Sequence, residues 1–384
     1  MIRLGVSIGL VVLTLWGCAN ATSDSTTEVF SFAGRQFQLA FSEIEEAIAN
    51  ESMASVESRE RRGNGPLVSP RSLNKDGSLY MVPSADWTSG FFPGSLWYMY
   101  EFTGDGFWKQ KAEEFTWNVE REQWNDRTHD MGFKMYCSFG NGYRITGEQT
   151  YKDILIQSAN TLITRFNPIV GAIRSWDHNR DKWGCPVIID NMMNLELLFW
   201  ATDVTGDSVY YHIAEAHAIT TLNNHFREDY SSFHVVDYNV ETGEVVNRHT
   251  HQGFAHESAW SRGQAWGLYG YTMAYRATGN TLFLEIAEKI TAFIFDHPRL
   301  PLDLIPYWDF DAPEIPNAPR DASAAAVTAS ALYELGLLVP EKAEKYHRLA
   351  NQIVDNLIKD YLAKPSGLRG FLLDDSTGYL PNNH

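Results

Sequence analysis

Cysteine is scarce in this sequence, which has only 3 among 384 residues. A chain of this length with so few thiols is not a small scaffold held together by disulfides, and its stability has to come from a large apolar core. Cys18 lies near the N-terminus, and the other two, Cys137 and Cys185, stand in apolar or aromatic surroundings. A disulfide between these two and a pair of buried free thiols both stay open on the sequence.

Positive charge is also in short supply. Lys and Arg number 31 against 48 Asp and Glu, which gives a formal charge of −17, and the basic residues are scattered along the chain. Nucleic acids and anionic membrane surfaces require a concentrated basic stripe. We therefore expect no nucleic-acid partner, and any anionic ligand has to be held by local Arg or His side chains.

Several signatures of catalysis are missing. The sequence contains neither a phosphate-binding glycine loop nor a G-x-S-x-G nucleophile elbow. His, Cys and carboxylate residues nowhere show the spacing of a closed metal site, and His249 and His251 in "NRHTHQG" alternate as they would along a β-strand. These absences give no support to a serine or cysteine nucleophile, and they predict that the protein has no metal site.

Long hydrophobic runs are absent as well, because the apolar stretch in "MIRLGVSIGLVVLTLWGCAN" is too short to span a bilayer and is typical of an export signal. Its ending, Leu15 to Cys18, resembles the lipobox of bacterial lipoproteins and predicts lipidation of Cys18. An ordinary secretory signal is the alternative. We expect a lipoprotein-type signal peptide at 1–18, a flexible tether at 19–30 and a single domain at 31–384. The protein would be exported and held at a bacterial membrane only by its lipid anchor, on the periplasmic or cell-surface side.

What the chain does have is a repeat. An apolar-aromatic segment that closes in Thr-Gly, followed by a second segment with aromatic residues and spaced alanines, recurs four times: "FFPGSLWYMYEFTGDGFWKQKAEEF", "FKMYCSFGNGYRITGEQTYKDILIQSA", "LELLFWATDVTGDSVYYHIAEAHA" and "GQAWGLYGYTMAYRATGNTLFLEIAEKI". A degenerate fifth copy is "AAAVTASALYELGLLVPEKAEKYHRLA". Each copy predicts a helical hairpin, because a glycine in the left-handed conformation is a favoured helix end.

The two helices of each hairpin differ in polarity. The first is apolar nearly all round, as in "LELLFWA", whereas the second carries charges on one face, as in "LFLEIAEKITAFIF". The first helix is therefore predicted to be buried and the second half-exposed, which implies two concentric rings. With a further helix over residues 41–58, we predict an all-α fold, an (α/α)6 toroid or six-hairpin barrel, with small β insertions such as "FHVVDYNV". An open α-solenoid of the same hairpins is the alternative.

In such a toroid the inner helices run parallel, and their N-termini open on one face. Residues just before each inner helix should then converge on one mouth. They are Asp86, Trp87, His129, Asp130, Asp190, Asn191, His256, Trp260, Arg262, Trp266, Arg320 and Asp321. Aromatic faces and charged groups around a concave site are typical of a carbohydrate pocket.

Asp130, Asp190 and Asp321 each have a purely structural interpretation, because Asp is a favoured N-cap whose charge suits a helix N-terminus. For Asp190 that interpretation is weaker, since Met193 stands where a capping box would place Glu or Gln. The preceding "PVII" surrounds Asp190 with apolar residues, and burial raises the pKa of a carboxyl group. With Asp130 as a second carboxylate nearby, the two acids would suit acid/base chemistry on a sugar.

Five motifs, in order, resemble one known family. "DWTSGFFPGSLW", "HDMGF", "IIDNMMNLELLFWA", "FHVVDYN" and "SRGQAWGLYGY" are similar to sequences of glycoside hydrolase family 88, the unsaturated glucuronyl hydrolases. The resemblance implies that residues 31–384 are one catalytic domain, that Asp190 is the general acid/base and that Asp130 is the second essential carboxylate. It also implies substrate-binding roles for Trp87, Trp176, His234, Gln252, Arg262 and Trp266.

The family's reaction, as the resemblance implies it, releases 4,5-unsaturated glucuronic acid from the non-reducing end of polysaccharide-lyase products by acid/base hydration of the C4=C5 vinyl ether. It requires no metal or organic cofactor, and the expected partners are unsaturated uronate-terminated oligosaccharides from glycosaminoglycans or ulvan. Three alternatives stay open: an unsaturated rhamnogalacturonyl hydrolase, a non-catalytic oligosaccharide-binding lipoprotein, and a polysaccharide lyase on the same scaffold. The "FHVVDYN" segment with His234 favours the glucuronyl group over the rhamnogalacturonyl one.

Overall fold

Each predicted hairpin is a pair of helices joined by a short connection in the computed structural model, which describes residues 22–52, 65–74, 78–178 and 181–363. The pairs are α3 (Phe91–Thr103) with α4 (Gly106–Trp117), α5 (Asn141–Thr146) with α6 (Gln149–Ile163), α7 (Leu195–Thr205) with α8 (Ser208–Asn224), α9 (Ser261–Thr278) with α10 (Thr281–Asp296), and α11 (Ala322–Leu338) with α12 (Ala343–Asn356). A π-helix, η4 (Gly132–Gly140), leads into α5, and a 3-10 helix, η5 (Ile189–Asn194), leads into α7.

Glycine ends the first helix of four hairpins, as predicted. Gly104, Gly147, Gly206 and Gly279 have φ values of 67°, 71°, 75° and 67°, and the amide of each donates to the carbonyl four residues earlier. Only glycine adopts this backbone conformation without strain. The fifth hairpin has Val339 at the corresponding position, with a φ of −128°, which explains why its sequence departs from the repeat.

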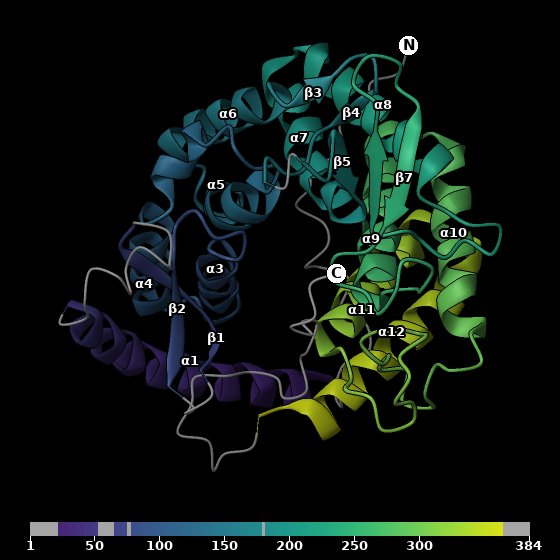
Figure 1. The fold of residues 1–384 in the computed structure, drawn as a ribbon. Coiled ribbons are helices and arrows are strands. Elements are labelled where there is room, and N and C mark those ends of the chain that lie inside the picture. Colours follow the sequence, from purple (N-terminus) through teal and green to yellow (C-terminus); the bar gives the residue numbers. More distant parts are fainter. Residues whose placement is uncertain (1–21, 53–64, 75–77, 179–180, 364–384) are drawn as a thin grey trace.

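The helices form two concentric rings. Figure 1 shows α3, α5, α7, α9 and α11 around the centre and α4, α6, α8, α10 and α12 outside them. The inner helix α9 is buried along most of its length, whereas the outer helix α10 is buried on one face only. Among the described residues there are eleven α-helices and only short strands, and the fold is a helical toroid with small β insertions, as predicted.

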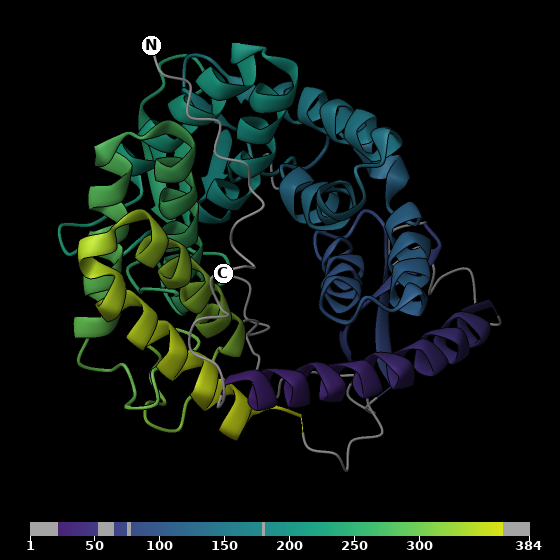
Figure 2. The same ribbon diagram turned by 180° about the vertical axis from the view of Figure 1, so that it is seen from behind.

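A long helix, α1 (Thr22–Ser52), runs along the remaining side of the ring, between the C-terminal end of the described chain and α4 (Figures 1 and 2). Because it begins at Thr22, residues 22–30 are not the flexible tether that we expected. The physical reason is aromatic packing: Phe30 stacks on Phe102 with ring centroids 3.8 Å apart, and Phe37 packs edge-on against Phe92. The predicted signal peptide, with Cys18, lies outside the described residues.

The strands make three small antiparallel sheets. β1 (Leu67–Leu73) pairs with β2 (Leu79–Pro83), and β3 (Phe166–Asn167) pairs with β4 (Ala172–Ile173). The third sheet has the order β5 (Cys185–Ile188), β6 (Val235–Tyr238) and β7 (Val245–His249). The segment "FHVVDYNV" thus contains a strand, β6, as predicted, and that strand is the central one of its sheet.

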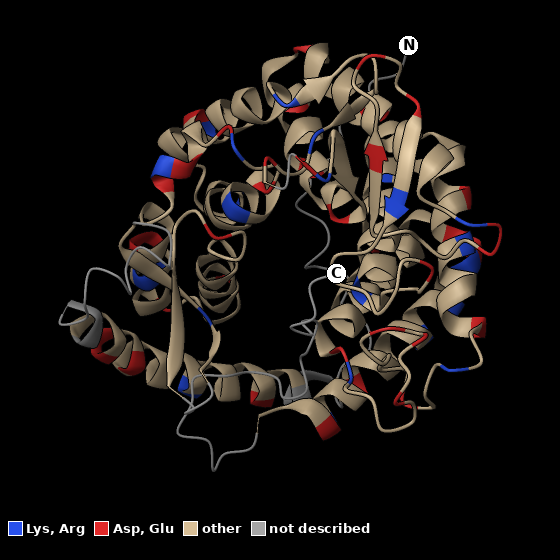
Figure 3. Ribbon diagram, viewed as in Figure 1, with Lys and Arg blue, Asp and Glu red and all other residues tan. Residues whose placement is uncertain are grey.

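Charged residues of both signs are interspersed around the ring, as Figure 3 shows. No helix of the described chain combines the length and apolar character that a membrane crossing requires. Cys137 and Cys185 are both free thiols, which decides between the two possibilities that the sequence left open.

Candidate active site

An aromatic wall stands at the N-terminal ends of the inner helices. Trp87, in the turn before α3, lies with its ring centroid 5.5 Å from Phe133 in η4, and Phe133 lies 5.3 Å from Trp266 in the second turn of α9. These rings come from segments far apart in the sequence. The predicted convergence of Trp87 and Trp266 on one mouth is therefore what the structure shows.

Asp190 lies at this mouth because it follows shortly after β5 of the three-stranded sheet. β5 and β6 pair with Ile188 opposite Val235, and the next amide along, Ile189 N–H, donates to the His234 carbonyl at 3.0 Å. The chain then turns into η5, whose second residue is Asp190. The residue is 7% exposed, and its side chain caps no helix. The structural interpretation of Asp190 as an N-cap is thus wrong.

Burial raises the pKa of Asp190 from 3.8 to about 7, and the negative charge of Asp130 adds to that rise. The residue's own backbone amide, the Arg262 guanidinium and the Trp266 indole N–H act in the opposite direction. The rise in the pKa of Asp190 that desolvation causes is therefore larger than the decrease caused by these three contacts. A carboxyl group in this state exchanges a proton near neutral pH, which a general acid/base must do.

His234 faces Asp190 in a defined tautomer. Its Nδ1 accepts hydrogen bonds from two backbone amides, those of His251 at 3.0 Å and Gln252 at 3.1 Å. The proton of the neutral ring must then be on Nε2, which lies 3.6 Å from Asp190 Oδ2. Burial holds the pKa of His234 well below its usual value, so the ring is neutral. His234 thus presents a neutral N–H donor to the acid.

Asp130 lies in the loop just before η4. Its Oδ2 accepts from the Thr128 hydroxyl at 2.7 Å, and its Oδ1 lies 3.2 Å from His129 Nε2. His129 is buried, and its Nδ1 donates to the Ser175 carbonyl at 2.8 Å, because a carbonyl oxygen can only accept. The Thr128 hydroxyl therefore holds Oδ2 by a hydrogen bond. Burial lowers the pKa of His129, so its ring is neutral, and Nε2 carries no proton and packs against Oδ1 without donating to it.

A close approach of two inner segments brings the acids together. The Phe133 amide donates to Asn194 Oδ1 at 3.0 Å, and a Cβ on Gly132 would lie only 2.6 Å from Asn194 Cα. Gly132 is two residues after Asp130, and Asn194 is four residues after Asp190. Only glycine permits this approach of the two segments that carry the acids.

Arg262 supplies the positive charge of the site. Its Nη1 donates to Ser323 Oγ at 2.9 Å and lies 3.6 Å from Asp321 Oδ2, and its guanidinium lies 5.1 Å from the Trp260 ring centroid. Asp321 caps α11 by accepting from Ala324 N–H at 2.9 Å. The structural interpretation therefore holds for Asp321, and Asp321 in turn orients Arg262.

Several buried polar atoms at this mouth have no hydrogen-bond partner in the part of the chain that the structure describes. They are Asp190 Oδ2, His234 Nε2 and Trp260 Nε1. Leaving such groups unpaired costs free energy, about 1 to 3 kcal/mol each. Their clustering around one acid indicates that a polar ligand completes the site.

The comparisons with known proteins agree with this geometry. No family model matches the chain. The unsaturated glucuronyl hydrolase of Formosa agariphila is 53% identical over 317 residues, which are 82% of this chain and 79% of the relative. This chain belongs to glycoside hydrolase family 88, the unsaturated glucuronyl hydrolases.

Two solved structures of family 88 members are similar to this one. An unsaturated glucuronyl hydrolase specific for heparin has a TM-score of 0.79 and 50% identity, over 84% of this chain and 86% of that chain. A mutant of the enzyme from Streptococcus agalactiae, complexed with dGlcA-GalNAc6S, has a TM-score of 0.67 and 26% identity, over 89% and 81% of the two chains. The chain is a glycosidase, as its family implies.

The family 88 resemblance places Trp176 beside the next sugar subsite. In the structure its ring contacts His234, which lies between Trp176 and Asp190. Its ring centroid is 6.0 Å from that of His234 and 5.1 Å from those of Trp183 and His251. Gln252 is half-buried, and its backbone amide is one of the two donors to His234. Both residues therefore border the site through His234.

Four residues of the predicted mouth make contacts within the scaffold of this hydrolase. Asp86 binds Arg71 at 2.7 Å and the Thr88 hydroxyl at 2.6 Å, and Asn191 donates to the Ile173 carbonyl. His256 Nδ1 accepts from the Thr250 amide, and Arg320 pairs with Asp303 at 3.0 Å. These contacts give the four residues structural roles, and a role in the site stays a prediction for them.

The sequence did not reveal Thr128, Ser175 or Asn194, whose contacts place the two acids. Asn194 carried the one available signal, a polar residue between apolar neighbours in "NMMNLELL". Across the described ranges, no group of three or more His, Cys, Asp or Glu side chains is arranged to hold a metal ion.

Proposed function

We propose that this enzyme releases 4,5-unsaturated glucuronic acid from the non-reducing end of polysaccharide-lyase products. The observation that carries the proposal is Asp190, whose pKa burial raises to about 7 beside Asp130, Arg262 and a neutral His234. A buried carboxyl group in this state can give a proton and later take one back, so one residue serves as both acid and base.

The reaction begins at the vinyl ether of the unsaturated sugar. Asp190 donates its proton to C4, and positive charge develops at C5 and the ring oxygen. Water adds to C5 while the ionised Asp190 accepts its proton, which gives a hemiketal. The hemiketal opens, the C5 carbonyl forms, and the hemiacetal left at C1 expels the remaining oligosaccharide as an alcohol. One water molecule is consumed, and no redox partner is needed.

Arg262 is proposed to bind the uronate carboxylate. The enzyme's formal charge of −17 does not oppose this, because at physiological salt surface charges beyond about 8 Å are largely screened. Asp130, held by Thr128 and facing the same space, is proposed to accept hydrogen bonds from sugar hydroxyls and to keep the pKa of Asp190 high. Trp87 and Trp266 offer faces to the sugar ring, and His234 and Gln252 border it.

Asp190→Asn tests the reaction directly. The variant should fold, bind a lyase product and leave its ultraviolet absorbance unchanged, whereas the wild type removes that absorbance as the double bond is consumed. Asp105→Asn, at an exposed N-cap of α4, is the matched control and should keep full activity. Turnover by Asp190→Asn at the wild-type rate would remove Asp190 from its role, and a rise in absorbance with the wild type would indicate a lyase.

The substrate class is proposed as sulfated or unsulfated glycosaminoglycan fragments, with ulvan fragments as a further candidate. The relatives named for heparin and for a chondroitin-type disaccharide support the first, and they favour it over rhamnogalacturonan. A panel of lyase digests of heparin, chondroitin, hyaluronan, ulvan and rhamnogalacturonan, assayed by the same loss of absorbance, ranks these substrates. Preference for the rhamnogalacturonan digest would refute the assignment.

We also propose that Cys18 is lipidated and that the mature protein is anchored to a bacterial membrane. The lipobox-like Leu15 to Cys18 supports this proposal. Mass spectrometry of the membrane fraction should find a lipidated N-terminal cysteine, and Cys18→Ala should move the protein to the soluble fraction. An unmodified mature chain in the soluble fraction would contradict it.

A further inference from the structure

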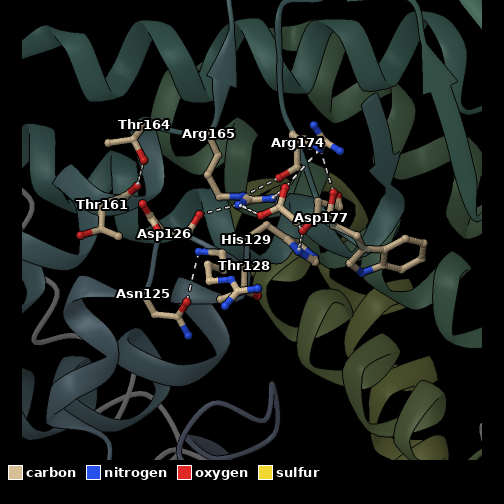
Figure 4. Close-up of polar contacts among 12 residues, drawn as sticks. Asn125, Asp126, Thr128, His129, Thr161, Thr164, Arg165, Arg174 and Asp177 are labelled. Carbon is tan, nitrogen blue, oxygen red and sulfur yellow. Dashed lines mark hydrogen bonds and ion pairs between the residues drawn. The ribbon is translucent and has the colours of Figure 1, made fainter. Parts of the chain in front are cut away.

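A single arginine behind the site contacts two loops of the mouth at once. Arg165 lies two residues after α6, and its side chain is 5% exposed. Its donors are all used: Nε donates to the Arg174 carbonyl at 2.9 Å, Nη1 to the Asp126 carbonyl and to Asp177 Oδ2 at 2.9 Å, and Nη2 to Asp177 Oδ1 at 3.3 Å and the Ser175 carbonyl at 3.4 Å. Figure 4 shows this guanidinium group between Asp126 and Asp177.

The two loops each carry a residue of the site. The first, residues 126–130, ends at Asp130. The second, residues 174–177, contains Trp176. A hydrogen bond from His129 to the Ser175 carbonyl also joins the two loops. A shift of one loop against the other would therefore have to break the contacts of Arg165 as well as this hydrogen bond.

A short chain of contacts connects the arginine to the acid. The Ser175 carbonyl accepts from both Arg165 Nη2 and His129 Nδ1, and His129 Nε2 in turn lies against Asp130 Oδ1. Displacing this carbonyl would turn the imidazole and move the ring edge that lies against Asp130 Oδ1. The hydrogen bond from Thr128 to Oδ2 would then be the described side-chain contact that still orients the carboxyl group.

We propose that Arg165 is a positioning residue, which sets the loop of Asp130 against the loop of Trp176 and thereby orients Asp130 for the reaction. This rests on the proposed function, in which Asp130 contacts the sugar. No contact described for the Arg165 side chain involves Asp130, Asp190 or the Trp176 ring, so the arginine acts through Ser175 and His129.

Arginine is required here by its shape. The planar guanidinium offers five N–H donors in a fixed fork, whereas a lysine ammonium offers three on a flexible stem. Five contacts to two loops cannot be satisfied by the smaller group. Asp177 supplies the carboxylate that receives two of the five, and Arg174, with Nε 3.4 Å from Asp177 Oδ1, braces it from the other side.

An open cavity of about 360 Å³ adjoins the guanidinium and gives small molecules access to it. Asp126, Arg165, Arg174 and Asp177 are among its lining residues. Removing the side chain by Arg165→Ala would therefore leave a space that a free guanidinium ion can enter and fill. Chemical rescue of this kind distinguishes a lost orienting group from general damage to the fold.

The test compares Arg165→Ala, Arg165→Lys and Arg144→Ala with the wild type. Misplacing a reacting group by about 1 Å costs on the order of 100-fold in rate, so kcat of both Arg165 variants should fall by about 10- to 100-fold. Millimolar guanidinium should restore part of the kcat of Arg165→Ala only. Arg144, which pairs with Glu101 through two bonds of 2.6 and 2.7 Å at the other end of the hairpin, is the matched control and should keep its kcat.

Amide hydrogen exchange of the substrate-free enzyme gives a readout independent of turnover. Arg165→Ala should accelerate exchange in both residues 126–130 and residues 174–177, and guanidinium should slow it again. If Arg165→Ala does not fold, Asp177→Asn and Arg165→Lys carry the same test. Wild-type exchange in both loops, or wild-type kcat in folded Arg165 variants, overturns the inference; a wild-type enzyme without turnover refutes the proposed function alone.

Discussion

The buried acid should make the enzyme less stable as the pH rises, and Asp190→Asn should remove that effect. A carboxyl group whose pKa is raised in the folded state contributes to the free energy of unfolding while it is protonated, and ionisation removes that contribution. Its contribution is fully present below the ordinary value of 3.8 and is lost as the pH rises through about 7. Asparagine has nearly the same shape and never ionises, so its variant lacks this loss.

The magnitude follows from the change in pKa. One pH unit corresponds to about 1.4 kcal/mol, so the rise from 3.8 to about 7 makes ionised Asp190 destabilising by about 4 kcal/mol. At about pH 5 only part of this loss has developed, and at about pH 8 it is complete. The advantage of Asp190→Asn over the wild type should therefore grow by about 2 to 3 kcal/mol between the two.

Urea unfolding of both proteins at the two pH values measures this quantity. Any constant effect of the amide group cancels, because only the growth of the difference with pH is used. Asp105→Asn serves again as the control, and its difference from the wild type should be the same at both pH values, since the residue is exposed. A difference for Asp190→Asn that stays level, or that shrinks as the pH rises, would refute the claim that burial keeps this acid neutral.

Three further expectations follow. First, kcat/KM should fall as the pH rises through about 7, because Asp190 must hold a proton to give it to C4, and a level profile across neutrality would contradict this. Second, Gly132→Ala should lower the free energy of unfolding by about 1 to 3 kcal/mol, since its Cβ would lie 2.6 Å from Asn194 Cα; an unchanged urea midpoint would show that the two segments can separate freely. Third, Arg262→Lys should raise KM by about tenfold with the fold intact, because a lysine cannot bind a carboxylate through two parallel bonds, and an unchanged KM would place the substrate carboxylate elsewhere.

The hairpins and the ring could be predicted from the sequence because their signals are local. The Thr-Gly ends, the all-apolar first helices and the half-charged second helices each fall within one segment, and local chemistry decides them. The helix predicted from residue 41 begins at Thr22 in the structure, and its first part was missed for the opposite reason. Its polar start resembles a linker, and its helical state depends on packing against distant residues, such as Phe30 on Phe102.

The arrangement within the site could be predicted only in part. The sequence indicated Asp130 and Asp190 as a pair, but it did not separate them from Asp321, whose capping role becomes clear only from the Ala324 amide. The contact of Asp190 with His234 depends on the pairing of β5 with β6, and sequence spacing says nothing about such pairing. Polar groups that brace a loop from behind, such as Arg165, leave no local pattern at all.

The four glycines that end inner helices with a positive φ lie at the rim of the ring opposite the active site. Each inner helix points its first turn at the mouth and its glycine at the opposite rim, where the connection to the outer helix is short and exposed. Affinity tags, fluorophores or a fused partner protein can therefore be inserted after Gly147 or Gly206 with the catalytic rim left undisturbed. The same rim offers a place to tether the enzyme to a solid support with its mouth turned toward the solution.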